Sequence, residues 1–194
     1  MPYKRSIEKD DIALLPPMEF GGEIIMVETL EGAKKAFGLL ASEKVVGFDT
    51  ETRPSFSKGE SYLPAILQLA TRDRAYLFRL DFYTPPQELI DFLSNPKILK
   101  VGVGIQDDLR GLGKLINFTP DGYVDLARVA KEHNIENFGL RALTAIFLDK
   151  RLLKGAKVTN WEMKQLSQAQ ILYAATDAVV GLLIYEEMKS FEMV

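Results

Sequence analysis

Hydrophobic and polar positions follow two different periods along most of the chain. Short apolar runs rich in β-branched residues predict strands, whereas apolar residues three or four positions apart predict helices. The predicted strands are 23–27, 44–51, 65–70, 75–78, 98–103 and a short last strand near 124–126. The predicted helices are 29–41, 85–93, 105–116, 127–133, 140–148 and 167–188. Because residues 71–74 (TRDR) predict a hairpin turn among helix–strand units, we expect an α/β fold with a mixed β-sheet flanked by helices on both faces.

The chain is predicted to form a single domain preceded by an arm. Its 194 residues fall within the usual size of one domain. Residues 1–22 hold three prolines and two glycines, which predicts an irregular arm with a short turn. Residues 23–194 form the domain, and Thr29 is placed to cap its first helix.

Composition excludes several kinds of site. The chain has no cysteine and one histidine, His133, which excludes thiol catalysis, cysteine-ligated zinc and a multi-histidine metal site. The net charge is −3 and the isoelectric point is about 5.4, which argues against a broad basic coat for nucleic acid. An acidic chain remains compatible with a nuclease, because carboxylate metal ligands lower the isoelectric point.

No segment predicts membrane insertion or export. The longest apolar run is eight residues, 178–185, whereas a membrane-spanning helix needs about 20. The charged N-terminal segment lacks the apolar stretch of a secretory signal. We therefore expect a soluble, intracellular protein in the cytoplasm that does not bind a membrane.

Two acidic side chains lie at the end of an apolar predicted strand. Asp49 and Glu51 in the segment GFDTE are two positions apart, so they project from the same face of a strand. Carboxylates this close repel each other and favour a cation, and oxygen ligands favour Mg²⁺ or Mn²⁺. The alternative is that both side chains face solvent at the strand end.

A second acidic pair follows the strand at 98–103. Asp107 and Asp108 fall in the first turn of the next predicted helix, where acidic residues also occur simply because they stabilise the helix dipole. The glycines at 102 and 104 resemble a dinucleotide-binding fingerprint. We reject that interpretation, because Asp107 stands where the third glycine belongs and would repel a pyrophosphate.

The last predicted helix carries a third signal. Tyr173 and Asp177 are four residues apart, so they share one helix face. Asp177 lies in a nearly apolar stretch, where an acid needs a ligand or a hydrogen-bond donor. The alternatives are an Asp177 that bonds a neighbouring helix end and a Tyr173 that packs in the core. Taken together, the acids and the phenol of these three segments suit two divalent metals that act in phosphoryl displacement.

In order and context, these segments resemble the three motifs of the DEDD superfamily of 3′-5′ exonucleases, in its DEDDy branch. The first motif is matched by 48–51 (FDTE), the second by 101–105 (VGVGI) with Asp108 before Leu109, and the third by 173–177 (YAATD). The resemblance covers roughly residues 24–190. It is closest to exonuclease domains of the Werner type, and ribonuclease D is a more distant relative.

The resemblance implies a ribonuclease H-like core and metal-dependent removal of nucleotides from a 3′ end. It implies that two divalent ions, Mg²⁺ or Mn²⁺, are bound by four carboxylates, and that Tyr173 positions the attacking water. The four implied ligands are Asp49, Glu51, Asp108 and Asp177. Asp108 is preferred to Asp107 because the family places the acid directly before leucine. Asp125 belongs to no motif and is predicted to cap the following helix.

Residues around the motifs are candidates for holding nucleic acid. A basic stretch before the last helix and the loop at 52–63 could contact phosphates or a terminal base. The candidates are Thr50, Thr52, Arg53, Phe56, Arg110, Lys154, Lys157 and Trp161. The alternatives are a solvated charged loop and a tryptophan that packs in the core.

The expected substrate is a nucleic acid with a free 3′ end, with DNA favoured. Two other functions stay open: a 3′ end-processing ribonuclease of the ribonuclease D type, and a catalytically silent nucleic-acid-binding module. A structural α/β protein with an acidic cleft is a third alternative. We further expect a protein partner that supplies a helicase or delivers the substrate.

Overall fold

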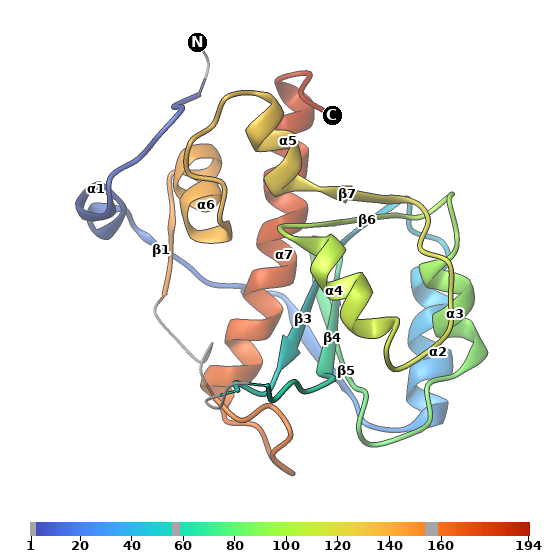
Figure 1. The fold of residues 1–194 in the computed structure, drawn as a ribbon. Coiled ribbons are helices and arrows are strands. Elements are labelled where there is room, and N and C mark those ends of the chain that lie inside the picture. The colour runs from blue at the N-terminus through green and yellow to red at the C-terminus, as the bar shows by residue number, and fades with distance from the viewer. Residues whose placement is uncertain (1–2, 56–58, 154–158) are drawn as a thin grey trace.

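The computed structural model describes residues 3–55, 59–153 and 159–194, and its centre is a six-stranded sheet (Figure 1). The strands lie in the order β2-β5-β4-β3-β6-β7. Their bounds are β2 Glu23–Val27, β3 Val45–Thr52, β4 Pro64–Ala70, β5 Arg74–Arg79, β6 Leu99–Gly102 and β7 Tyr123–Asp125. Strand β4 is antiparallel to both β3 and β5, and the other pairs are parallel. The predicted mixed sheet is therefore confirmed.

Helices cover both faces of this sheet, as predicted. On one face α2 (Leu30–Leu40), α3 (Gln87–Leu93) and α4 (Ile105–Leu112) share a core with β3, β4 and β5. On the other face α7 (Gln168–Ser190) crosses the sheet, with α5 (Leu126–Glu132) and α6 (Leu140–Leu148) packed beside it (Figure 1). Thr29 accepts a hydrogen bond from the Gly32 N–H group and caps α2, as expected.

Helix α7 approaches β3 closely because glycine occupies the contact. A Cβ atom on Gly47 would lie 2.0 Å from the Ala178 carbonyl oxygen, a distance that no side chain could occupy. The contact lies two residues before Asp49 on β3 and one residue after Asp177 on α7. Gly47 thus sets the distance between the two elements that carry predicted carboxylates.

The N-terminal arm differs from the prediction of an irregular segment. It contains α1 (Lys9–Leu14) and β1 (Pro17–Met18), and β1 pairs in parallel with β8 (Arg151–Leu152). The Phe20 N–H group donates to Thr176 Oγ1 at 3.1 Å and so anchors the arm to α7. Short elements held by partners more than 130 residues away give no local periodicity, which explains why the sequence pattern missed them.

The structure contributes one observation on membranes. Among the residues that it describes, no helix combines the length and the apolar character needed to cross a bilayer.

Candidate active site

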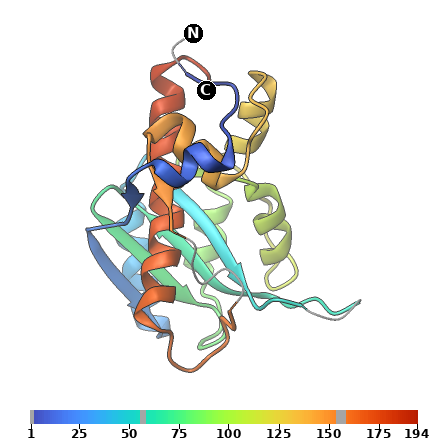
Figure 2. The same ribbon diagram turned by 90° about the vertical axis from the view of Figure 1, so that its left-hand side faces the viewer.

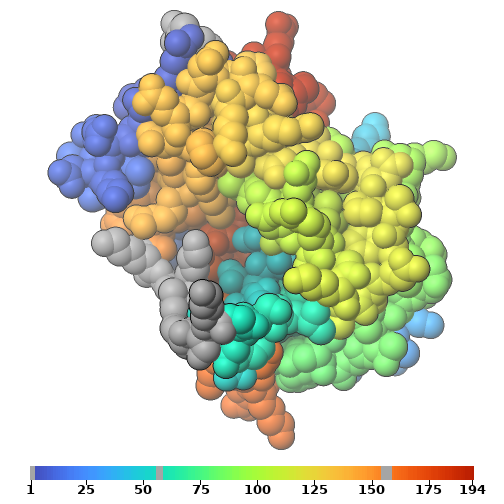
Figure 3. Space-filling view, viewed as in Figure 1, coloured from blue at the N-terminus to red at the C-terminus, as the bar shows by residue number. Residues whose placement is uncertain are grey.

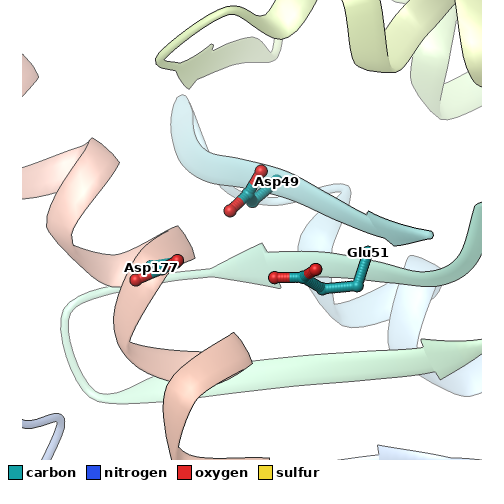
Figure 4. Close-up of side chains that lie close together, drawn as sticks. All are labelled: Asp49, Glu51 and Asp177. Atoms are coloured by element: carbon teal, nitrogen blue, oxygen red, sulfur yellow. The ribbon is translucent and has the colours of Figure 1, made fainter. Parts of the chain in front are cut away.

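The alternation of β3 directs Asp49 and Glu51 toward α7, where Asp177 meets them (Figure 4). A carboxylate oxygen from each of the three lies within 4.8 Å of those of the other two. Glu51 and Asp177 are only 8% and 6% exposed. Three hard oxygen donors gathered in this way form a donor set suited to Mg²⁺ or Mn²⁺.

The start of α7 fixes the position of its functional face. Ser167 caps the helix and Gln170 completes a capping box, so the first turn has defined partners. Tyr173 and Asp177 follow at positions that share a face, and both line one cavity with Asp49 and Glu51. The predicted pairing of Tyr173 and Asp177 on one helix face is thus seen in the structure.

Asp108, in the first turn of α4, is not one of the three acids within 4.8 Å of one another, but it contacts the same strand. Its carboxylate accepts a hydrogen bond of 2.6 Å from Thr50 Oγ1 on β3, and its charge raises the pKa of Asp49. Asp107, by contrast, is 76% exposed and pairs with Arg110. Of the two acids, Asp108 is therefore the one that lies near Asp49, and its role as a metal ligand stays a prediction.

The turn before α4 depends on a residue outside the three motifs. Gly104 has a φ of 81°, in the region that favours glycine. Asp125 accepts a hydrogen bond of 3.0 Å from the Gly104 N–H group and another from the Ala127 N–H group. The predicted cap at α5 is confirmed, and the same side chain also fixes the turn that presents Asp108. No sequence pattern indicated this second contact.

Burial and mutual repulsion disfavour the charged form of these acids. Burial raises the pKa of Asp49 well above its usual range, and the charges of Asp108, Asp177 and Glu51 raise it further. Burial raises the pKa of Asp108 to about 6, although the hydrogen bond from Thr50 opposes that shift. A bound cation would relieve both costs, because it offsets the repulsion and replaces the lost hydration.

Tyr173 is held beside the cluster by a buried ring. Burial raises its pKa above the usual value near 10, and the negative charge of Asp177 adds to the shift. The Trp161 ring lies 6.2 Å from the Tyr173 ring and is 0% exposed. The prediction that Trp161 stacks on a base is therefore wrong. The alternative of a core tryptophan holds, and its ring supports the catalytic face of α7.

The site opens to the surface through a cavity of about 460 Å³. Figure 3 shows a hollow between α6, α4 and β3, with α7 visible at its floor. Besides the acids and Tyr173, the lining includes Arg141 in the first turn of α6. No sequence pattern indicated Arg141, because an arginine at the start of a helix is not distinctive.

The other predicted nucleic-acid contacts are placed with mixed results. Thr50 bonds Asp108, and Thr52 ends β3. Arg53 lies in the loop that projects beyond β3 (Figure 2), where it pairs with Glu162 at 3.3 Å. Arg110 is exposed on α4. Phe56, Lys154 and Lys157 lie outside the described residues. Contact of any of these residues with nucleic acid stays a prediction.

Curated relatives share the sequence over most of the chain. The Mus musculus bifunctional 3′-5′ exonuclease/ATP-dependent helicase WRN is 34% identical over 95% of this chain and 14% of the relative. An Arabidopsis thaliana 3′-5′ exonuclease is 32% identical over 90% of this chain and 66% of the relative. The chain thus spans a small part of the first relative and about two thirds of the second.

Solved structures share the fold at low sequence identity. The Aedes aegypti Nibbler EXO domain matches with a TM-score of 0.78 at 20% identity and covers 87% of this chain and 88% of that one. Escherichia coli RNase D matches with a TM-score of 0.78 at 18% identity, over 89% of this chain and 47% of that one. These matches confirm the predicted ribonuclease H-like fold.

The family assignment agrees with both comparisons and with the acidic cluster. The family model described as 3′-5′ exonuclease matches residues 24–191, which include β3, α4 and α7. Metal dependence is general in that family, and the residues present here suit a divalent ion. This chain belongs to the 3′-5′ exonuclease family.

Proposed function

We propose that this chain is a metal-dependent 3′-5′ exonuclease of the DEDDy type that removes nucleotides from the 3′ end of DNA. The observation that carries the proposal is the convergence of Asp49, Glu51 and Asp177 within 4.8 Å at the floor of an open cavity. Buried acids that repel one another cost free energy of folding, and a bound cation would offset that cost.

Asp49, Glu51, Asp108 and Asp177 would hold two divalent ions. Bound there, the ions would supply Lewis-acid activation of the nucleophile and charge neutralisation at the departing 3′ oxygen. The chain's own contribution is to fix the ligands. Thr50 orients Asp108, and Gly47 brings Asp177 against β3. Together these contacts set the carboxylates before substrate arrives, which lowers the cost of reorganisation.

Tyr173 orients the attacking water in this proposal. Its pKa lies above the usual value because of burial and the nearby carboxylates, so the phenol keeps its proton at neutral pH. A protonated phenol is a hydrogen-bond donor and acceptor but a poor general base. Tyr173 therefore positions the water and leaves its deprotonation to the cationic environment.

The preference for DNA rests on the sequence relatives. The mouse relative named as an exonuclease and helicase is 34% identical, whereas RNase D structures are 18% identical or less. One of those structures, RNase D of Trypanosoma brucei, is in complex with the RNA U12. Ribonuclease activity is therefore the second candidate. The expected helicase or substrate-delivering partner also follows from the mouse relative, of which this chain spans 14%.

The test compares 5′-labelled single-stranded DNA, duplex DNA with a recessed 3′ end, and single-stranded RNA, each with Mg²⁺, Mn²⁺ or EDTA. We expect a ladder of single-nucleotide steps that requires metal and forms fastest on DNA. Asp108→Ala should abolish the ladder, whereas the matched control Asp107→Ala should keep it, because Asp107 is exposed. A ladder fastest on RNA would favour the ribonuclease. Metal binding without cleavage of any substrate would contradict the exonuclease and favour the binding module.

A further inference from the structure

A second cavity lies beside the one that holds the carboxylates, toward the N-terminal arm. It has a volume of about 870 Å³ and lies between α1 and the start of α6. Gly139, Arg141 and Leu152 line both cavities. The two cavities are therefore adjacent at Arg141, which places the second one where a strand that ends at the carboxylates would leave along α1.

The floor of this second cavity is apolar. It includes Ile7, Ile12, Ala142 and Leu152, and Ile7, Ile12 and Leu152 are buried. Bases of a single strand expose apolar faces that pack on such a surface, whereas the bases of a duplex are stacked inside it. The floor therefore suits an unpaired strand.

The polar lining of the cavity is mostly cationic. The lining contains three cationic side chains, Lys9, Arg141 and Arg151, and one acidic side chain, Asp10. The whole chain, by contrast, carries a net charge of −3. Arg151 Nε donates to the Leu15 carbonyl oxygen at 2.8 Å, so its guanidinium is fixed in place. A local excess of cations on an acidic protein favours a polyanion at this position.

We propose that the groove lined by Ile7, Lys9, Ile12, Arg141, Arg151 and Leu152 binds the unpaired nucleotides that precede the 3′ end. Arg141 contacts the phosphate nearest the carboxylates, and Lys9 contacts one further along the strand. The N-terminal arm is thus part of the substrate site. This proposal rests on the proposed exonuclease function, and its ligand is a single strand of either DNA or RNA.

The test measures how cleavage depends on substrate length. Wild-type protein, Lys9→Glu and Arg141→Ala are given a dinucleotide and a strand of about 12 nucleotides, as DNA and as RNA. Lys9→Glu should lower kcat/KM about tenfold on the longer strand and clearly less on the dinucleotide. The salt slope on the longer strand should fall by about one for each lost phosphate contact. The matched control Lys35→Glu, an exposed change on α2, should alter neither substrate.

A binding measurement tests the groove independently of cleavage, so it distinguishes failure of this proposal from failure of the proposed exonuclease function. Fluorescence anisotropy of the labelled longer strand is measured with Asp49→Asn, and with Asp49→Asn combined with Lys9→Glu. Weaker binding of the double variant supports the groove even if no substrate is cut. Equal binding by both, or an equal loss of kcat/KM on short and long substrates, would overturn the groove while leaving the exonuclease in place. Thermal unfolding of Lys9→Glu shows that the variant is folded.

Discussion

The two faces of the sheet each bury charge, but they do so in opposite ways. On the α7 face, Asp49, Glu51 and Asp177 bring like charges within 4.8 Å. On the α3 face, the fully buried amine of Lys100 donates to the carbonyl oxygens of Phe92 and Asn95 at 3.2 and 2.9 Å. The Phe92 ring lies 5.6 Å from the same amine.

The difference separates a structural charge from a functional one. The fold itself supplies two carbonyl acceptors to the Lys100 amine, so this buried charge has partners without a ligand. On the other face, burial and the charges of Asp108, Asp177 and Glu51 raise the pKa of Asp49. A bound cation would offset this repulsion, and strongly shifted pKa values cluster at functional sites. The comparison therefore predicts different consequences for mutations on the two faces.

The largest expected effect is on catalysis. Asp49→Asn and Asp177→Asn remove a metal ligand, and we expect each to lower kcat by about 10³-fold or more, because ion-mediated charge stabilisation is worth several kcal/mol. Without metal, neither variant should be less stable than wild type, since each relieves repulsion. Single-turnover cleavage and thermal unfolding in EDTA measure the two effects. Activity near the wild-type level in Asp177→Asn would contradict the proposal that this carboxylate binds a catalytic metal.

The next effect is stabilisation by the ion itself. At a Mn²⁺ concentration about 100 times the dissociation constant, binding contributes about 2.7 kcal/mol, which raises Tm by roughly 5–10 °C for a chain of this size. Asp49→Asn should lose this shift and Lys100→Met should keep it. Calorimetry in Mn²⁺ and in EDTA provides the measurement. An equal shift in Asp49→Asn would place the ion elsewhere.

A smaller effect is expected at the phenol. Tyr173→Phe keeps the ring against Trp161 and removes only the hydroxyl, so the fold and the ligands should persist. We expect kcat to fall about 10-fold to 100-fold, which is at or below the lower end of the roughly 10²–10⁴-fold typical of acid–base catalysis, because Tyr173 positions the water without removing its proton. The metal-induced rise in Tm should be unchanged. A variant that loses the rise in Tm would show instead that Tyr173 shapes the metal site.

The sequence predicted the features that depend on local patterns, namely the secondary structure and the motif residues. Hydrophobic patterns with periods of 2 and 3.6 residues predicted most of the strands and helices. The motifs singled out Asp49, Glu51 and Asp177, which lie close together in the structure. Adjacent strands β3 and β6 carry Asp49 and lead into Asp108, which is why motifs far apart in the sequence meet.

What the sequence missed depends on contacts between distant segments. The pairing of β1 with β8 joins residues more than 130 positions apart over two residues each, so neither strand has a visible period. Arg141 lines the catalytic cavity only because α6 begins there. For Trp161 the sequence left both base stacking and core packing open, and only the packing against α7 and the sheet shows that the ring is buried.

The smallest expected effect is the contribution of the buried Lys100 amine to the pH dependence of stability. Burial lowers the pKa of Lys100 from 10.5 to about 8, so between those values the unfolded chain binds more protons than the folded one. Stability attributable to Lys100 therefore rises with pH, by about 1 kcal/mol between pH 7 and pH 9. Lys100→Met should flatten this rise, whereas the exposed control Lys97→Met should keep it. Denaturant unfolding at several pH values measures the slope. An identical slope in Lys100→Met would show that the buried amine keeps its charge over this pH range. The two faces of the sheet would then differ less in how they shift the pKa of a buried charge than their contacts indicate.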